Sequence, residues 1–112
     1  MTGLTTHILD TAKGRPAPGI TVRLYEAAAH QPLAEAVTDA NGRALLVADD
    51  ADILRAGVYE LTFAMGMHFG NNEAEPAFLG DIVLRFGIDP AQPHYHIPLL
   101  VSPWSYTTYR GS

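Results

Sequence analysis

The sequence predicts an all-β protein that folds as a sandwich of two sheets, with one short helix. Three observations support this prediction. Apolar and polar side chains alternate with a period of two at 20–26, 58–63 and 82–88, which is typical of half-buried strands. Glycine and proline separate these segments, and Asn41-Gly42 is a turn dipeptide because both residues tolerate positive φ. Six to eight short strands at regular spacing are typical of a sandwich.

The elements follow in order along the chain. Strands are expected at 4–9, 20–26, 33–38, 58–63, 82–88, 94–101 and 104–109. The helix is expected at 49–56, where aspartates suited to the N-cap precede an apolar pair and Gly57 can end the helix. The polar segment 68–79 fits either a short helix or a long loop. No repeat, charge block or linker divides the 112 residues, so we expect one domain over 1–112.

The charge balance excludes several classes of partner. Asp and Glu number 12 against 7 Lys and Arg, and Lys13 is the only lysine. We therefore expect no nucleic-acid partner and no membrane partner, because both attract proteins through a dense positive field. The chain has no cysteine, which excludes disulfides, a thiolate nucleophile and a cysteine zinc site. Met1 to Asp10 lacks the pattern of a secretory signal, and no stretch approaches the roughly 20 apolar residues of a membrane span, so we expect a soluble, cytoplasmic protein.

Two histidines lie two residues apart in a predicted strand. His94 and His96 therefore share one face of that strand, opposite its apolar side chains. Three interpretations are open: solvated or structurally bonded histidines, a metal site completed by His7 or His68, and acid–base catalysis. No carboxylate or cysteine lies at a matching short spacing, which disfavours the metal site.

Arg43 and the last residues of the sequence are further candidates. Arg43 follows the Asn-Gly turn, and although such a charge is usually solvated, a turn at the end of a sheet is also where anion-binding arginines are placed. The final Tyr109-Arg110-Gly111-Ser112 directly follows a strand-like run. We expect this ending to bring a guanidinium, a hydroxyl and a free carboxylate close to ordered structure, against the usual disorder of termini.

These motifs together resemble the transthyretin-like 5-hydroxyisourate hydrolases. The resemblance runs in order along nearly the whole chain, through 4–10, 14–17, 38–43, 94–100 and 102–112. The final Tyr-Arg-Gly-Ser is similar to the ending that marks the hydrolases and is missing from the hormone-carrying transthyretins. Val101 replaces a more usual leucine, Trp104-Ser105 replaces an aromatic-glycine pair, and the segment 68–79 is the least family-like part.

The resemblance implies both an architecture and an activity. The fold would be an eight-stranded, two-sheet, transthyretin-like sandwich, assembled as a homotetramer (a dimer of dimers) with active sites in a channel between dimers. The small-molecule substrate would be 5-hydroxyisourate, hydrolysed to 2-oxo-4-hydroxy-4-carboxy-5-ureidoimidazoline in urate catabolism without a cofactor or metal ion. Family catalytic roles transfer to His7, Arg43, His96 and Ser112. The substrate-binding set comprises these four residues with Tyr109, Arg110 and Gly111. His94 receives no catalytic role from the resemblance.

The implied reaction breaks the N1–C6 amide bond of the substrate ring. It needs a deprotonated water, a stabiliser for the oxyanion and a proton for the leaving nitrogen. We expect His7 with Ser112 to activate water, Arg43 to orient the substrate and its developing charge, and His96 to position the substrate or the leaving group. The division of acid and base between the two histidines stays open.

A concentration of Arg43 and Arg110 with the two histidines would make a cationic pocket in an otherwise acidic protein. The alternative function is that of a non-catalytic transthyretin-like carrier, which uses the same channel to bind a small aromatic ligand without turning it over.

Overall fold

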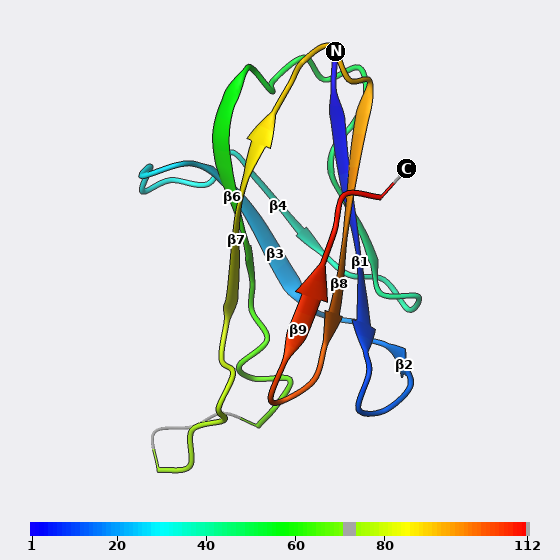
Figure 1. The fold of residues 1–112 in the computed structure, drawn as a ribbon, viewed down its shortest axis with the longest axis vertical. Helices are drawn as coiled ribbons and strands as arrows, with labels where there is room; N and C mark the ends of the chain where they lie inside the picture. The colour runs from blue at the N-terminus through cyan, green and yellow to red at the C-terminus, as the bar shows by residue number, and fades with distance from the viewer. Residues whose placement is uncertain (71–73, 112) are drawn as a thin grey trace.

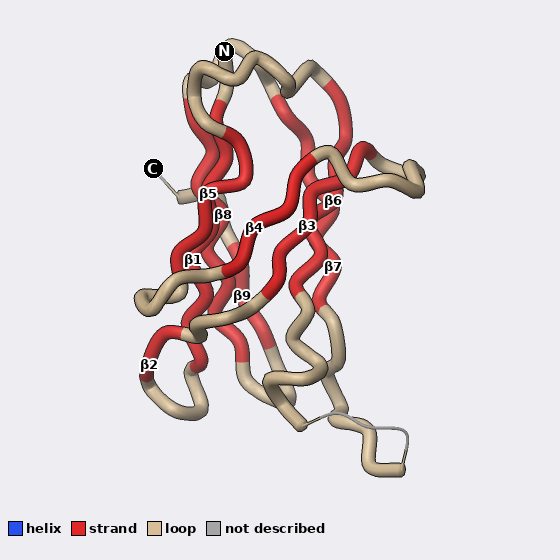
Figure 2. The backbone as a smooth tube through the Cα atoms, turned by 180° about the vertical axis from the view of Figure 1, so that it is seen from behind, coloured by secondary structure: helices blue, strands red, loops and turns tan. Residues whose placement is uncertain are grey.

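Two β-sheets pack face to face in the computed structural model, which describes residues 1–70 and 74–111 (Figure 1). The strands are β1 (Gly3–Asp10), β2 (Arg15–Pro16), β3 (Thr21–Glu26), β4 (Ala34–Val37), β5 (Arg43–Val47), β6 (Gly57–Phe63), β7 (Ile82–Ile88), β8 (His94–Val101) and β9 (Tyr106–Thr108). One sheet has the order β2-β1-β8-β9, with β5 also pairing with β1, and the other has the order β4-β3-β6-β7. The predicted all-β sandwich is confirmed, and Figure 2 shows its two layers from behind.

The space between the sheets is filled by apolar side chains from alternating strand positions. On β1, Leu4 and Ile8 are fully buried, while Thr5 and His7 are only half-buried on the opposite face. Val22 and Leu24 on β3 show the same alternation. The period of two in the sequence is thus an inside–outside pattern, and Thr5 and His7 lie on the outer face of the five-stranded sheet.

The first long strand lies beside the last long strand. β1 and β8 pair in parallel (Figure 1). In this pairing Thr5 lies opposite His96 and Gly3 opposite His94. β5 pairs with β1 from the other side, where Arg43 lies opposite His7. These two pairings bring residues from three distant parts of the sequence onto one sheet face.

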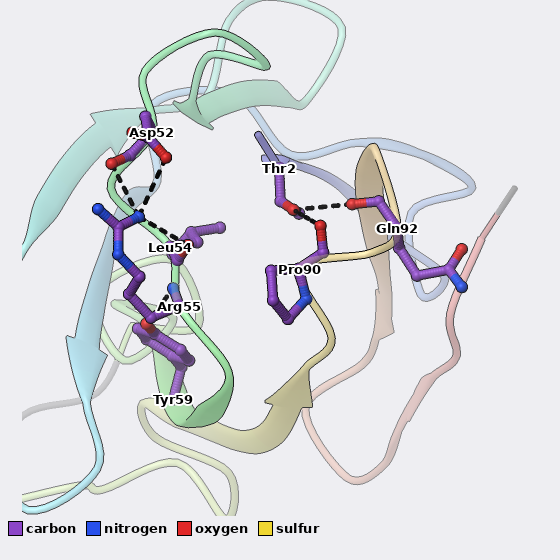
Figure 3. Close-up of polar contacts among 7 residues, drawn as sticks. All are labelled: Thr2, Asp52, Leu54, Arg55, Tyr59, Pro90 and Gln92. Atoms are coloured by element: carbon purple, nitrogen blue, oxygen red, sulfur yellow. Dashed lines mark hydrogen bonds and ion pairs between the residues drawn. The ribbon is translucent and has the colours of Figure 1, made fainter.

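The helix predicted at 49–56 is wrong. This segment forms a turn and an irregular loop, and Asp52 has φ of 55°, in the left-handed region. The Arg55 guanidinium donates to the Asp52 carbonyl and carboxylate at 2.9 and 3.1 Å, and the Arg55 N–H donates to the Tyr59 hydroxyl at 2.9 Å (Figure 3). Aspartates that suit an N-cap also favour such local side-chain bonds, and here these bonds replace the helix.

The structure also contains two strands, β2 and β5, that the sequence did not predict, and it shows the form of most of the segment 68–79. β2 contains only two residues and β5 only five, and neither is long enough to show a clear period in the sequence. Of the segment 68–79, residues 68–70 and 74–79 are turns and loop rather than helix, and residues 71–73 lie outside the described part of the chain. Within the described residues, no helix is long and apolar enough to span a membrane.

Candidate active site

The outer face of the five-stranded sheet carries three of the predicted catalytic residues. His7 projects from β1, Arg43 begins β5 directly opposite it, and His96 lies on β8 opposite Thr5. All of these side chains are partly or fully accessible rather than buried between the sheets. Strand pairing therefore brings together His7, Arg43 and His96.

The turn before β5 holds Arg43 at the end of its strand. The Asp39 carboxylate accepts the backbone N–H groups of Asn41 and Arg43 at 2.9 and 3.0 Å, and the Asp39 N–H donates to the Arg43 carbonyl at 2.9 Å. Gly42 has φ of 76°, and a Cβ at this position would clash with the Ile8 carbonyl. The turn thus requires glycine here, as the Asn-Gly dipeptide predicts.

Asp39 is also the fixed negative charge beside the site. The backbone hydrogen bonds from Arg43 and Asn41 lower the pKa of its carboxyl, and the charges of Arg43 and His7 lower it further. Asp39 is therefore ionised at neutral pH and partly balances the positive charge of Arg43.

The His7 ring contacts the backbone of the turn before β5. Its Nε2 lies 2.9 Å from the Asn41 carbonyl oxygen. A carbonyl oxygen only accepts, so Nε2 carries a proton. When the ring is neutral, Nδ1 is then the nitrogen with a free lone pair, as a general base requires.

A pocket of about 260 Å³ opens between these strands. It is lined by Thr5, Thr6, Asp39, Arg43, Ala44, Leu45 and His96. Its volume lies just under the roughly 300–1,000 Å³ of pockets for drug-sized ligands. The pocket therefore suits a small ligand that contacts a guanidinium, an imidazole and the apolar side chains of Ala44 and Leu45.

His96 is neutral at physiological pH. Burial lowers the pKa of its imidazole, and the positive charges of Arg43, His7 and His94 lower it further. A neutral imidazole has one donor and one acceptor nitrogen, so His96 can either accept or give a proton in the pocket.

The two neighbouring histidines are both hydrogen-bonded to the Thr5 hydroxyl. Nε2 of His94 lies 2.9 Å and Nδ1 of His96 lies 2.8 Å from Thr5 Oγ1, and Nδ1 of His94 lies 2.6 Å from a carboxylate oxygen of Asp49. Both ring nitrogens of His94 are thus occupied by protein atoms.

His68, which sequence reasoning considered as a third metal ligand, lies elsewhere. Its Nε2 bonds the Asp10 carboxylate at 2.7 Å in a separate pocket. Among residues 1–70 and 74–111, no group of three or more His, Cys, Asp or Glu side chains is arranged to hold a metal ion.

The residues of the final Tyr-Arg-Gly-Ser motif that the structure describes lie in two different places. The Gly111 N–H donates to the His96 carbonyl at 2.7 Å, which sets Gly111 beside the site. The Arg110 guanidinium instead lies 4.9 Å above the Tyr95 ring and donates to the Gln92 side chain at 3.1 Å. Tyr109 and Arg110 line a different pocket, of about 430 Å³, together with residues of β7 and β8.

The expected clustering of Arg110 with Arg43 is therefore not found within this chain. The alternation of side chains along β8 explains the difference. Arg110 contacts Tyr95, which faces inward, whereas Gly111 pairs with His96, which faces outward. Ser112 lies outside the described residues.

Sequence reasoning missed Thr5 and Asp39. Thr5 lies two residues before His7 on the same face of β1, so the period of two could have indicated it. Asp39 lies two residues before the Asn-Gly dipeptide, a position where aspartate commonly bonds the backbone of its own turn. The contact of His94 with Asp49 has no such signal, because it joins residues 45 positions apart.

The sheet topology and the histidine and arginine side chains on the outer face define a transthyretin-type sandwich with a site for a small polar ligand. Comparison with known proteins agrees with this class. The sequence model of the HIUase/Transthyretin family matches residues 4–111, and the chain belongs to this family.

Its relatives include both kinds of protein in that family name. The chain is 50% identical over 117 residues to 5-hydroxyisourate hydrolase of Caulobacter vibrioides, with 100% of each chain covered. The structure of Klebsiella pneumoniae 5-hydroxyisourate hydrolase superposes with a TM-score of 0.83 at 38% identity, again with 100% of each chain covered. Transthyretin from Sparus aurata superposes with a TM-score of 0.80 at 31% identity, covering 96% of this chain and 95% of that one.

Proposed function

We propose that this protein is a 5-hydroxyisourate hydrolase, which opens the six-membered ring of its substrate in urate catabolism. One observation carries the proposal: His7, Arg43 and His96 meet on one sheet face, in a chain half identical over its full length to a protein of that name. The product is 2-oxo-4-hydroxy-4-carboxy-5-ureidoimidazoline. We assign no cofactor and no metal ion to the reaction.

The proposed mechanism uses Arg43 and His96, which line the pocket, and His7, which lies opposite Arg43 on the neighbouring strand. Nδ1 of His7, left free by the contact of Nε2 with Asn41, takes a proton from water with the help of Ser112. The water oxygen attacks C6 of the substrate, and the Arg43 guanidinium holds the substrate and the negative charge that develops on the carbonyl oxygen. The N1–C6 bond then breaks, and N1 leaves with a proton, so that the proton His7 took from water is balanced by the one that N1 gains. His96 positions the substrate or this leaving nitrogen.

The final motif has two proposed roles in binding. Gly111 fixes the end of the described chain against β8, beside His96. Tyr109 and Arg110 face another pocket of the same chain, so we propose that they contribute to substrate binding by holding the motif in place.

A non-catalytic carrier of a small aromatic ligand is the second candidate. The similarity to a transthyretin over nearly the whole chain favours it. A carrier has no need of imidazoles that move protons or of a guanidinium that stabilises an oxyanion, whereas amide hydrolysis uses groups of both kinds. Saturable binding of an aromatic ligand, with no effect on hydroxyisourate decay, would identify the carrier.

We also propose that the chain is one domain over 1–112 and forms a homotetramer, a dimer of dimers, in the cytoplasm. The site is shallow within one chain, since Leu45 at its rim is 58% exposed, and a second dimer placed over this face would enclose it. Sedimentation should give four times the 12.1 kDa mass of the chain, and a monomer at working concentration would contradict the assembly. Cell fractionation tests the compartment.

The decisive experiment generates 5-hydroxyisourate in place from urate and follows its ultraviolet decay with and without the protein. We expect decay well above the spontaneous rate. A protein lacking Gly111 and Ser112 should remain folded and lose most of this acceleration. Unchanged decay with the full chain would overturn the function, and normal turnover by the shortened chain would overturn the role of Ser112.

A further inference from the structure

Four side chains form a continuous line of hydrogen bonds that ends at His96. The Asp49 carboxylate contacts His94 Nδ1 at 2.6 Å, His94 Nε2 contacts the Thr5 hydroxyl at 2.9 Å, and the same hydroxyl contacts His96 Nδ1 at 2.8 Å. The line runs from the loop after β5, through β8 and β1, and back to β8. Asp49 and His94 have no part in the mechanism derived above.

The direction of each bond follows from counting protons. An ionised carboxylate only accepts, so His94 donates to Asp49 through Nδ1–H. A neutral His94 then has a bare Nε2, which accepts the single hydroxyl proton of Thr5. The Thr5 oxygen has no second proton to give, so it accepts from His96 Nδ1–H. A neutral His96 is left with an unprotonated Nε2.

The opposite direction requires an additional proton. If both nitrogens of His94 were protonated, Nε2–H would donate to Thr5, and the Thr5 proton would turn toward His96 Nδ1. His96 would then carry its proton on Nε2. The two directions therefore give His96 opposite tautomers, one an acceptor at Nε2 and the other a donor there.

The surroundings of His96 leave its Nε2 as the ring nitrogen that faces a ligand. Its imidazole is kept neutral by burial and by the nearby positive charges. Among the described residues, Nδ1 is the ring nitrogen with a hydrogen-bond partner, and His96 lines the pocket. Nε2 is therefore the nitrogen available to a bound ligand.

We propose that Asp49, His94 and Thr5 are positioning residues that hold the proton of His96 on Nδ1 and so present Nε2 to the substrate as a hydrogen-bond acceptor. Carboxylate–histidine pairs set the tautomer of metal-binding histidines by the same logic. The catalytic consequence rests on the proposed hydrolase function, and the tautomer itself does not.

The first test measures the tautomer without any substrate. In ¹⁵N-histidine NMR spectra of the unaltered protein at neutral pH, we expect His96 to carry its proton on Nδ1. The isosteric substitution Thr5→Val removes the acceptor, so the spectrum should shift toward the Nε2–H form. A proton on Nε2 in the unaltered protein, or an unchanged spectrum in Thr5→Val, would overturn the proposal.

The second test separates positioning from packing. Thr5→Val should lower kcat about tenfold, the effect of one lost hydrogen bond in the transition state, with a smaller change in KM. Thr5→Ser keeps the hydroxyl and should restore most of kcat. Equal losses in Thr5→Ser and Thr5→Val would show a packing role and contradict positioning.

The third test uses the exposed end of the line, where substitution does not disturb the core. Asp49 is 68% exposed, and Asp49→Asn should lower kcat and alter the His96 spectrum, whereas the neighbouring Asp50→Asn should change neither. An Asp49→Asn protein with an unchanged spectrum would exclude Asp49 from the line. If the unaltered protein does not hydrolyse hydroxyisourate, the hydrolase function fails, but the NMR outcome still decides the tautomer.

Discussion

The backbones of Gly111 and His96 are joined by a hydrogen bond, and the His96 ring occupies the space that a Cβ on Gly111 would need. The Gly111 N–H donates to the His96 carbonyl at 2.7 Å, and a Cβ on Gly111 would lie 2.9 Å from Cδ2 of the His96 ring. Real Cβ atoms essentially never come so close, so any other residue at 111 displaces either the imidazole or the end of the chain. The glycine of the final motif is thus required by the position of a proposed catalytic ring.

Gly111→Ala should therefore reduce turnover while leaving the sandwich folded. We expect kcat to fall about tenfold or more, since a misplaced catalytic group loses alignment with the reacting atoms, and stability to change by less than about 0.5 kcal/mol. Gly87→Ala is the matched control, because a Cβ there meets nothing closer than 4.0 Å. Equal activities of the two variants in the ultraviolet decay assay would contradict the argument.

His7→Ala and Arg43→Ala should each abolish most hydroxyisourate hydrolysis. Loss of a general base costs about a hundredfold to ten-thousandfold in rate, and Arg43→Lys should restore little, because lysine lacks the planar fork of the guanidinium. Steady-state kcat/KM measures both effects. Arg23→Ala is the control, since Arg23 forms an exposed ion pair with Glu35 on the other sheet. A comparable loss there would indicate a general effect on folding.

The sequence predicted the parts of the site that depend on strand alternation and turn chemistry. His7 and His96 lie on outward positions because the apolar residues beside them are needed inside, and Arg43 begins a strand because Asn-Gly forms the turn before it. These are local rules, each acting over a few residues.

The sequence did not predict relationships that depend on where distant segments meet. The contact of Asp49 with His94 requires the loop after β5 to lie beside β8, and the helix predicted over that loop was wrong. Arg110 was expected beside Arg43, yet it stacks on Tyr95. The side of the sheet on which its side chain lies depends on how the chain after β9 pairs with β8. Spacing alone carries no information on such pairing.

Treatment with a strong chelator should leave hydroxyisourate hydrolysis unchanged. The two nitrogens of His94 are bound to Asp49 and Thr5, and Nδ1 of His96 is bound to Thr5, so the two histidines offer a metal ion one nitrogen between them. We expect full kcat after exhaustive dialysis against EDTA, with untreated protein as the control. A loss that zinc alone restores would establish a metal site.

Asp10 and His68 should contribute to stability in a pH-dependent way. Their 2.7 Å contact joins two side chains that are only 3% and 16% exposed. Burial raises the pKa of Asp10, but hydrogen bonds from His68 and from the Lys13 and Ala12 backbone, with the charge of His68, together lower it below 3.8. A lowered carboxyl pKa means that the unfolded chain binds more protons, so this stabilisation is complete above about pH 3.8 and is lost as the pH falls below that value.

Asp10→Asn should accordingly destabilise the protein by about 2 kcal/mol at pH 7, because it removes a charged partner of a buried hydrogen bond. Urea unfolding at pH 7 and at about pH 3 measures the difference from the unaltered protein, which should shrink in acid as Asp10 itself becomes protonated. Asp50→Asn, at an exposed aspartate, should show little difference at either pH. A destabilisation by Asp10→Asn that stays constant from pH 7 to pH 3 would show that the ionised carboxylate is not its source.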